Sequence, residues 1–132
     1  MEASALLMLD VLRSYRCQDR FELHAFVVMP DHLHLLLTPA PDVSLEKALQ
    51  FIKGGFSFRL KSKREVWERG FNEVQIRDLG KFEACRRYIE GNPVRGRLAS
   101  VAEEYPFSSA SLSEMIDPIP EHFTRCRLEA RG

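Results

Sequence analysis

The segment from residue 21 to residue 37 constrains the fold of this 132-residue chain more than any other part. Phe21–Met29 and His32–Leu37 are two apolar stretches of strand length, separated only by Pro30 and Asp31. Because proline and aspartate are typical turn residues, the two stretches are predicted to form an antiparallel hairpin. The sequence therefore predicts an antiparallel pair of strands in this part of the chain.

Two histidines lie at the start of the second predicted strand. Side chains alternate between the faces of a strand, so His32 and His34 share one face, while Leu33, Leu35 and Leu37 point to the other face, into a core. Two imidazoles on one face can bind a metal ion, act as acid and base, or simply be polar groups on a partly solvent-exposed face. The spacing alone leaves these three readings open.

Length and cysteine content limit the class of protein. A chain of this size forms about one domain and needs no disulfide to hold its core. Cys17, Cys85 and Cys126 are odd in number and widely spaced, which predicts neither a disulfide framework nor a zinc ribbon and fits the reducing cytoplasm. The apolar residues 5–9 are followed by Asp10, so they indicate an amphipathic helix and neither a signal peptide nor a membrane span.

Positive charge is concentrated in the middle of the chain. The whole sequence holds 19 basic and 19 acidic residues, but residues 47–97 hold 13 basic and 6 acidic ones. Residues 47–64 contain six basic side chains and no acidic one, which indicates either a surface for a phosphate backbone or a solvated helix face. The predicted phosphate contacts in this run are Lys53, Arg59, Lys61, Lys63 and Arg64.

Helical periodicity accounts for three further segments. Residues 3–16 form the first predicted helix. Ser44 is the expected N-cap of a second helix, whose apolar stripe runs to Phe56. Asp78 is the expected N-cap of a third helix, which ends before Pro93 because proline disfavours helix at the preceding residue. The core positions predicted for the third helix are Leu79, Phe82, Cys85 and Ile89.

A short strand and a tail complete the predicted organisation. Residues 73–77 read as a strand, since Val74 and Ile76 alternate with polar neighbours. Residues 111–132 are rich in serine, proline and charge and show weak periodicity, which predicts a loosely ordered tail. The chain is thus predicted to be an α+β protein with one folded domain at residues 1–110.

Tyr88 and Asn92 are four residues apart near the end of the third predicted helix, hence on one face. Taken singly, a helix tyrosine usually packs at the rim of a core, and an asparagine before proline usually ends a helix. Together with His32 and His34 they supply the parts for metal-assisted attack at phosphorus. The imidazoles and the amide oxygen can hold a cation, which makes a phenol, otherwise a weak nucleophile at neutral pH, effective.

Four segments of this chain resemble the REP-associated tyrosine transposases, a branch of the single-tyrosine HUH transposases. The resemblance extends from about residue 5 to residue 110 and preserves the order and spacing of its motifs. It lies in Phe21–Thr38 with its Pro-Asp-His-Leu-His sequence, Trp67–Phe71, Tyr88–Val94 and Tyr105–Ser109.

The resemblance implies roles for particular residues. His32 and His34 would be the HUH metal ligands, Asn92 would complete a Mg²⁺ or Mn²⁺ site, and Tyr88 would be the nucleophile. The implied substrate is single-stranded DNA folded into hairpins, the repeat palindromes of the family. Cleavage would leave a 5′-phosphotyrosine and a free 3′-hydroxyl, and reversal onto another end would rejoin the strand. Arg86 and Arg87, next to the tyrosine, are expected to position the scissile phosphate.

The same resemblance implies an RNA-recognition-motif-like, ferredoxin-like domain with an antiparallel sheet and helices on one face. In the family a strand precedes the first helix, whereas this chain begins almost inside that helix. We therefore expect an N-terminally truncated sheet whose exposed edge invites another chain to fill the gap. The sequence also admits a homodimer.

Two rival functions fit the same sequence. The first is a noncatalytic remnant that binds hairpin DNA or RNA through the basic segment. The second is a metal-dependent phosphodiesterase in which His32 and His34 activate water and Tyr88 only packs. Replacement of Tyr88 by phenylalanine distinguishes the second from a transposase, because only a transposase needs the hydroxyl.

Overall fold

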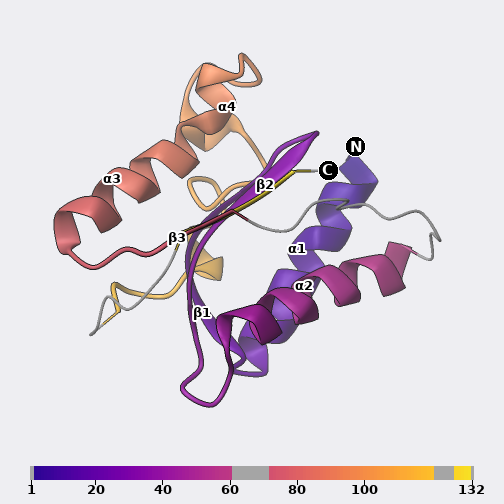
Figure 1. Cartoon of the computed structure of the whole chain (residues 1–132). Coiled ribbons are helices and arrows are strands. Elements are labelled where there is room, and N and C mark those ends of the chain that lie inside the picture. The colour runs from indigo at the N-terminus through magenta and orange to yellow at the C-terminus, as the bar shows by residue number, and fades with distance from the viewer. Residues whose placement is uncertain (1, 61–71, 121–126, 132) are drawn as a thin grey trace.

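The computed structural model describes residues 2–60, 72–120 and 127–131 (Figure 1). Within them, four strands form one antiparallel sheet in the order β1-β2-β4-β3. The elements in chain order are α1 (Glu2–Cys17), β1 (Phe21–Val28), β2 (His32–Pro39), α2 (Leu45–Leu60), β3 (Asn72–Val74), α3 (Leu79–Glu90), α4 (Asn92–Arg95), two 3-10 turns (Ala102–Glu104 and Ser113–Met115) and β4 (Arg127–Arg131).

The predicted hairpin is confirmed. Strands β1 and β2 pair along their whole length, from Phe21 opposite Pro39 to Val28 opposite Leu33. The backbone N–H of Met29 donates to the carbonyl of His32 across 2.8 Å and closes the turn. The hairpin is the framework on which the other layers pack.

The sheet is covered on both faces. Helices α1 and α2 pack on the face that carries Leu33, Leu35 and Leu37, in agreement with the predicted orientation of these leucines. Helix α3 packs on the opposite face, against Leu36 and the alternate residues of β1. Figure 1 shows the sheet edge-on between these two layers. The predicted α+β fold is therefore confirmed, and α3 adds a second layer to the predicted helices on one face.

The capping residues predicted for two helices are confirmed. Ser44 accepts a hydrogen bond from the N–H of Lys47 at 3.0 Å, and Asp78 accepts one from Lys81 at 2.8 Å. Leu79, however, is 51% exposed, so its prediction as a core residue is wrong. It lies in the first turn of α3, one residue after the cap, whereas the three other predicted core positions of α3 are buried.

Strand β4 lies between β2 and β3, antiparallel to both. Leu128 is the partner of Leu35 on one side and of Glu73 on the other. A strand from the chain's own C-terminal segment therefore lies beside β2 inside the sheet. Residues 127–131 were predicted to belong to a loosely ordered tail. They form a strand instead, because the N–H and C=O groups of β2 and β3 offer hydrogen-bond partners on both sides.

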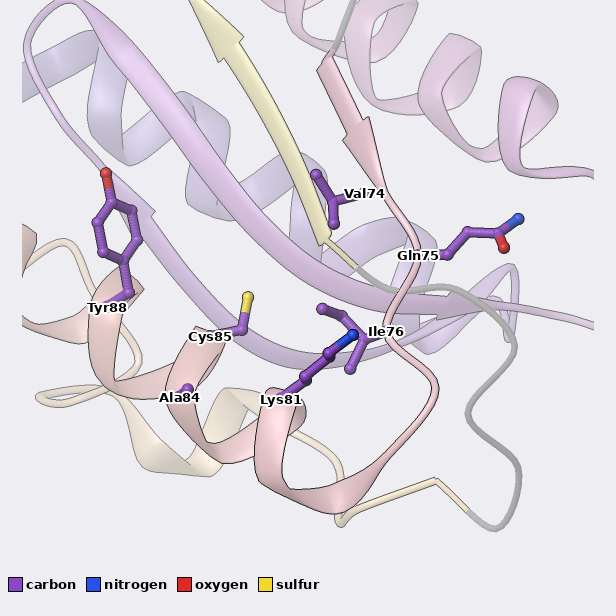
Figure 2. A pocket seen from close by; sticks show the side chains of 7 residues that line it. All are labelled: Val74, Gln75, Ile76, Lys81, Ala84, Cys85 and Tyr88. Atoms are coloured by element: carbon purple, nitrogen blue, oxygen red, sulfur yellow. The ribbon is translucent and has the colours of Figure 1, made fainter.

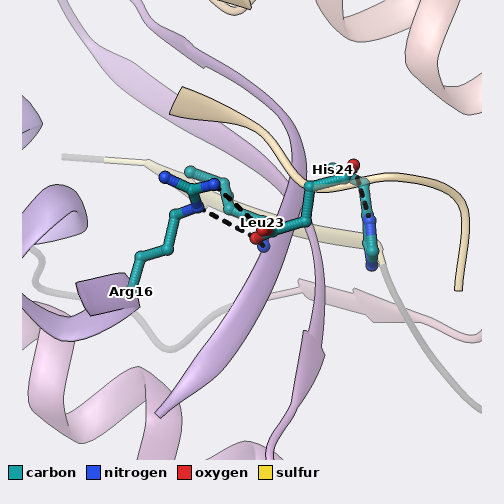
Figure 3. Close-up of polar contacts among 4 residues, drawn as sticks. Arg16, Leu23 and His24 are labelled. Atoms are coloured by element: carbon teal, nitrogen blue, oxygen red, sulfur yellow. Dashed lines mark hydrogen bonds and ion pairs between the residues drawn. The ribbon is translucent and has the colours of Figure 1, made fainter. Parts of the chain in front are cut away.

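Residues before β4 are also anchored, through Asp117. The Arg16 guanidinium donates two hydrogen bonds to the Asp117 carboxylate, at 2.9 and 3.0 Å. The Leu23 N–H donates to the same carboxylate at 2.8 Å, and the Asp117 N–H donates to the Leu23 carbonyl at 2.6 Å. Figure 3 shows these contacts joining α1, β1 and the segment that leads to β4. Burial would raise the pKa of Asp117, but the hydrogen bonds from Arg16 and Leu23 outweigh it and hold this pKa below its usual value.

His24 contacts the same segment from β1. It sits where the β1–β2 register shifts, and it is buried. Its Nε2 lies 3.0 Å from the hydroxyl of Thr38, its Nδ1 lies 3.4 Å from the carbonyl of Asp117, and its ring meets Phe82 edge-on. Burial lowers the pKa of His24 from its usual value of 6.5. No role is predicted for His24 from the sequence, and its contacts in the structure are those of a structural residue.

No helix in the three described ranges is both long and apolar enough to cross a membrane.

Replacement of Asp117 by asparagine is expected to lower the free energy of unfolding by about 1–2 kcal/mol, since hydrogen bonds to charged groups are the stronger ones. Urea denaturation measures this change. Asp10→Asn is the matched control, because Asp10 forms only an exposed ion pair with Arg13 at 3.7 Å and is expected to contribute less than about 0.5 kcal/mol. Equal effects of the two substitutions would contradict the anchoring role.

The burial of His24 predicts a pH dependence of stability. The folded protein disfavours the charged imidazole, so the unfolded chain binds more protons once the pH falls below the ordinary pKa of 6.5. The free energy of unfolding is therefore expected to fall between pH 7.5 and pH 5, and His24→Gln is expected to flatten that part of the curve. Parallel curves for the two proteins in urea denaturation would show that His24 contributes nothing.

Candidate active site

The histidine pair lies on the face of β2 that α3 covers. The rings of His32 and His34 are 4.8 Å apart between centroids and nearly perpendicular, at 89°. His34 is 1% exposed, with both ring nitrogens buried, whereas His32 is partly exposed at the start of the strand. The two imidazoles therefore converge on one spot, as the alternation of side chains along the strand predicts.

Asp31 orients the first of these histidines. Its carboxylate lies 2.5 Å from Nδ1 of His32. An ionised carboxylate can only accept a hydrogen bond, so the proton of a neutral His32 ring is on Nδ1 and Nε2 carries the lone pair. A carboxylate bound to the far nitrogen is the usual arrangement around a metal-binding histidine. This tautomer leaves Nε2 of His32 as the nitrogen that can accept a hydrogen bond or bind a metal ion.

Tyr88 meets the histidine pair from α3. Its ring centroid is 5.9 Å from that of His34, at an angle of 85°. The side chain is 43% exposed, which a purely structural tyrosine at a core rim would not require. Figure 2 shows the ring standing off α3 with its hydroxyl directed away from the helix. His32, His34 and Tyr88 are therefore brought together from two separate segments.

Asn92 is the first residue of α4, because α3 ends at Glu90 and Gly91 separates the two helices. The side chain of Asn92 is half-buried. Within the described ranges it forms no hydrogen bond with the histidines or with Tyr88. Within the same residues, no three His, Cys, Asp or Glu side chains gather as a metal site.

The described part of the basic segment, residues 47–60, is separate from this site. Lys53 lies on α2, which covers the face of the sheet opposite the histidine pair. The backbone of Arg59 belongs to the last turn of α2. The predicted contacts Lys61, Lys63 and Arg64, and the side chain of Arg59, lie outside the described residues.

Two arginines directly precede Tyr88 on α3. Arg86 lies 3.6 Å from the carboxylate of Glu90, one turn further along the helix. Arg87 is exposed on the last turn. Arg86 is therefore directed along α3 by an ion pair, and Arg87 is the more accessible of the two.

Arg95 is a functional candidate that the sequence did not reveal. Its guanidinium carbon lies 4.3 Å from the centroid of the Tyr88 ring, and Nη2 donates a hydrogen bond to the Tyr88 backbone carbonyl. The two residues are seven positions apart but belong to different helices. Helical spacing could not pair them, because the chain changes direction at Gly91.

The segment Tyr105–Ser109 fixes the end of α3 against the sheet. The hydroxyl of Tyr105 donates to the carbonyl of Val28 at 2.6 Å, and burial raises the pKa of this phenol. The hydroxyl of Ser109 donates to Glu90 of α3 at 2.6 Å and accepts from the N–H of Phe26 at 3.0 Å. This motif therefore holds β1 and α3 together and sets the position of Tyr88.

A groove of about 420 Å³ begins beside Tyr88 and runs between α3 and the strand β3 with the residues that follow it. Figure 2 shows its two walls, one from each element. Its floor is largely apolar and its rim carries one amine and one amide. The lining residues are Val74, Gln75, Ile76, Lys81, Ala84, Cys85 and Tyr88.

Comparison with known proteins identifies the family. The family model described as IS200-like transposase matches residues 5–92. A protein of Haemophilus influenzae described as a REP-associated tyrosine transposase is 30% identical in an alignment of 115 positions that covers 76% of this chain. The ISDra2 transposase TnpA of Deinococcus radiodurans is 32% identical in an alignment of 63 positions that covers 44% of this chain. The chain belongs to the IS200-like transposase family.

A solved structure gives the same assignment. The structure of a REP-associated tyrosine transposase bound to a REP hairpin superimposes with a TM-score of 0.71 and 25% identity, over 85% of this chain and 69% of that one. The resemblance predicted from the sequence is confirmed. The chain spans 65% and 45% of the lengths of the two relatives named above.

Proposed function

We propose that this protein is a metal-dependent transposase that cleaves and rejoins single-stranded hairpin DNA through a 5′-phosphotyrosine at Tyr88. The observation that carries the proposal is the contact between the half-exposed Tyr88 and His34, whose ring also contacts His32. A half-exposed tyrosine thus lies beside a buried imidazole, which in turn contacts a second, partly exposed one. Membership of a transposase family supports the same reaction class.

The residues present fit a divalent cation. Two adjacent imidazoles, one of them oriented by Asp31, form the donor set. His32 and His34 would hold Mg²⁺ or Mn²⁺, and we propose Asn92 as the amide ligand, which requires its side chain to turn toward the pair. When bound, the cation neutralises phosphate oxygens and so lowers the barrier to attack by a phenol. Mn²⁺ suits imidazole better than Mg²⁺ does.

The proposed reaction is an exchange of phosphodiesters. The hydroxyl oxygen of Tyr88 bonds to phosphorus while the bond from phosphorus to the 3′ oxygen breaks. The phenol gives up its proton to solvent, and the leaving 3′ oxygen takes one up. A 3′-hydroxyl from another DNA end then attacks the phosphotyrosine, which rejoins DNA and restores the tyrosine.

The proposed DNA contacts fall into two groups. Arg87, with Arg86 behind it, is next to Tyr88 and suits the scissile phosphate. Lys53 and the backbone of Arg59 belong to α2, on the opposite layer. We propose that they, together with Lys61, Lys63 and Arg64, which follow in sequence, contact a more distant part of a hairpin. The similar solved structure is bound to a REP hairpin, which supports a hairpin substrate for this chain. A cytoplasmic location and a homodimer belong to the proposal as well.

The first test is a denaturing-gel assay for a covalent protein–DNA adduct. The protein is incubated with Mn²⁺ and single-stranded hairpin DNA from the flanks of its own gene. We expect an adduct with the unaltered protein and none with Tyr88→Phe, because the hydroxyl is the nucleophile. Tyr15→Phe is the control, since Tyr15 stacks on Phe51 at 5.2 Å in the other layer, and it should retain the adduct.

Other outcomes identify the rival functions. Cleavage that survives Tyr88→Phe would indicate a phosphodiesterase that activates water. Hairpin binding without any cleavage or adduct would indicate a noncatalytic DNA-binding protein. The exposure of Tyr88 argues against the first of these, because that reaction leaves the tyrosine with packing alone.

Metal binding gives a second test that needs no activity. Asp31→Asn removes the carboxylate that orients His32, so the affinity for Mn²⁺ is expected to fall by about 10- to 100-fold. Isothermal titration calorimetry measures this affinity. Asp42→Asn, a change of the same kind on an exposed loop, is the control. An unchanged affinity in Asp31→Asn would exclude the proposed role of the carboxylate.

A further inference from the structure

We propose that Arg95 is a positioning residue for Tyr88, which fixes the orientation of the tyrosine ring and places a positive charge beside the nucleophile. The inference rests on the proposed function, since it takes Tyr88 as the nucleophile. It deepens that proposal by assigning the arginine that acts on the tyrosine. Among the described contacts, the arginine that meets the Tyr88 ring is Arg95. Arg86 and Arg87 are the neighbours of Tyr88 in sequence.

Two contacts join Arg95 to the same residue. The guanidinium lies over the face of the Tyr88 ring, 4.3 Å from the guanidinium carbon to the centroid, well within the distance at which a cation and an aromatic ring attract each other. One of its nitrogens also donates to the backbone carbonyl of Tyr88. Because one planar group holds both the backbone and the ring, the ring has little freedom to rotate away from His34.

Gly91 provides the space that Arg95 needs. A Cβ atom at position 91 would lie 2.9 Å from Nη1 of Arg95 and 3.0 Å from the carbonyl oxygen of Arg87. The backbone of Gly91 has φ of −83°, which any residue can adopt. A side chain at position 91 would therefore displace the flexible end of Arg95 and press on the Arg87 carbonyl, so the contact with Tyr88 depends on the turn between α3 and α4.

The same geometry leaves Arg95 able to meet a phosphate. A guanidinium has five N–H donors, and the contact with the Tyr88 carbonyl occupies a minority of them. Arg95 is exposed at the end of α4, on the surface from which DNA would reach the tyrosine. By contrast, Arg86 is directed toward Glu90. A phosphate that approaches the hydroxyl of Tyr88 would therefore meet the guanidinium of Arg95 beside it.

The positioning role is tested first without activity, by NMR of the protein with ¹³C-labelled tyrosine rings. The chain has three tyrosines, and Tyr88→Phe identifies the signal of interest. Arg95→Gln and Gly91→Ala should each shift the Tyr88 ring signals and leave the signals of Tyr15 and Tyr105 in place. If the Tyr88 signals do not move in Arg95→Gln, the proposal is wrong whatever the protein catalyses.

The consequence for the reaction is tested by the rate of adduct formation at saturating hairpin DNA. We expect Arg95→Gln to slow this step by about 10- to 100-fold, because a misplaced nucleophile costs that much. The dissociation constant for DNA should change by less than about threefold, since positioning acts on the rate. Arg95→Lys should recover part of the rate, because it keeps the charge but not the planar group.

Arg97→Gln is the matched control. It removes an equal charge two residues away, at an exposed position that makes no contact with Tyr88 within the described residues, and should change the rate by less than about twofold. A weaker affinity with an unchanged rate at saturation would show that Arg95 only contacts DNA and would overturn the proposal. If the unaltered protein forms no adduct, the proposed function fails, while the NMR measurement still decides whether Arg95 positions the tyrosine.

Discussion

Burial of β2 on both faces is the constraint on which the rest of this structure depends. Its odd-numbered leucines pack against α1 and α2, while Leu36 packs against α3. The alternation that sends the leucines one way sends His32 and His34 the other way, into the layer that carries Tyr88. A shift of the strand by one residue would exchange the two faces and bury the histidines among leucines. The register of one strand thus fixes both the core and the candidate site.

The sequence could predict what depends on neighbours along the chain. The hairpin, the faces of its side chains, and the caps Ser44 and Asp78 follow from local patterns, and the structure contains them. What it could not predict depends on distant partners. Nothing in the sequence around Asp117 indicates its role, because its partner Arg16 is 101 positions away along the chain and close to it only in the folded structure. The role of Arg95 is likewise not visible in the sequence, because it depends on the turn at Gly91 that places its guanidinium over the Tyr88 ring.

The residues of the candidate site lie on two different types of secondary structure. The histidines lie on a strand in the middle of the sheet, whereas Tyr88 lies on a helix whose end is secured by Ser109 and Glu90. Groups placed on rigid elements keep their separation, which a reaction at phosphorus requires. Among the two histidines and Tyr88, the tyrosine is the most exposed and His34 the most buried.

The position of β4 in the sheet has a consequence for how the protein is made. Roughly 50 residues separate β3 from β4, and a ribosome adds about 5–20 residues per second. During translation, the backbone edges of β2 and β3 that pair with β4 therefore stay unpaired for several seconds, until β4 has left the ribosome. Such edges are templates for pairing with other chains. The nascent protein is thus more prone to aggregate than the finished one, and slower translation of its last third would lengthen the exposure.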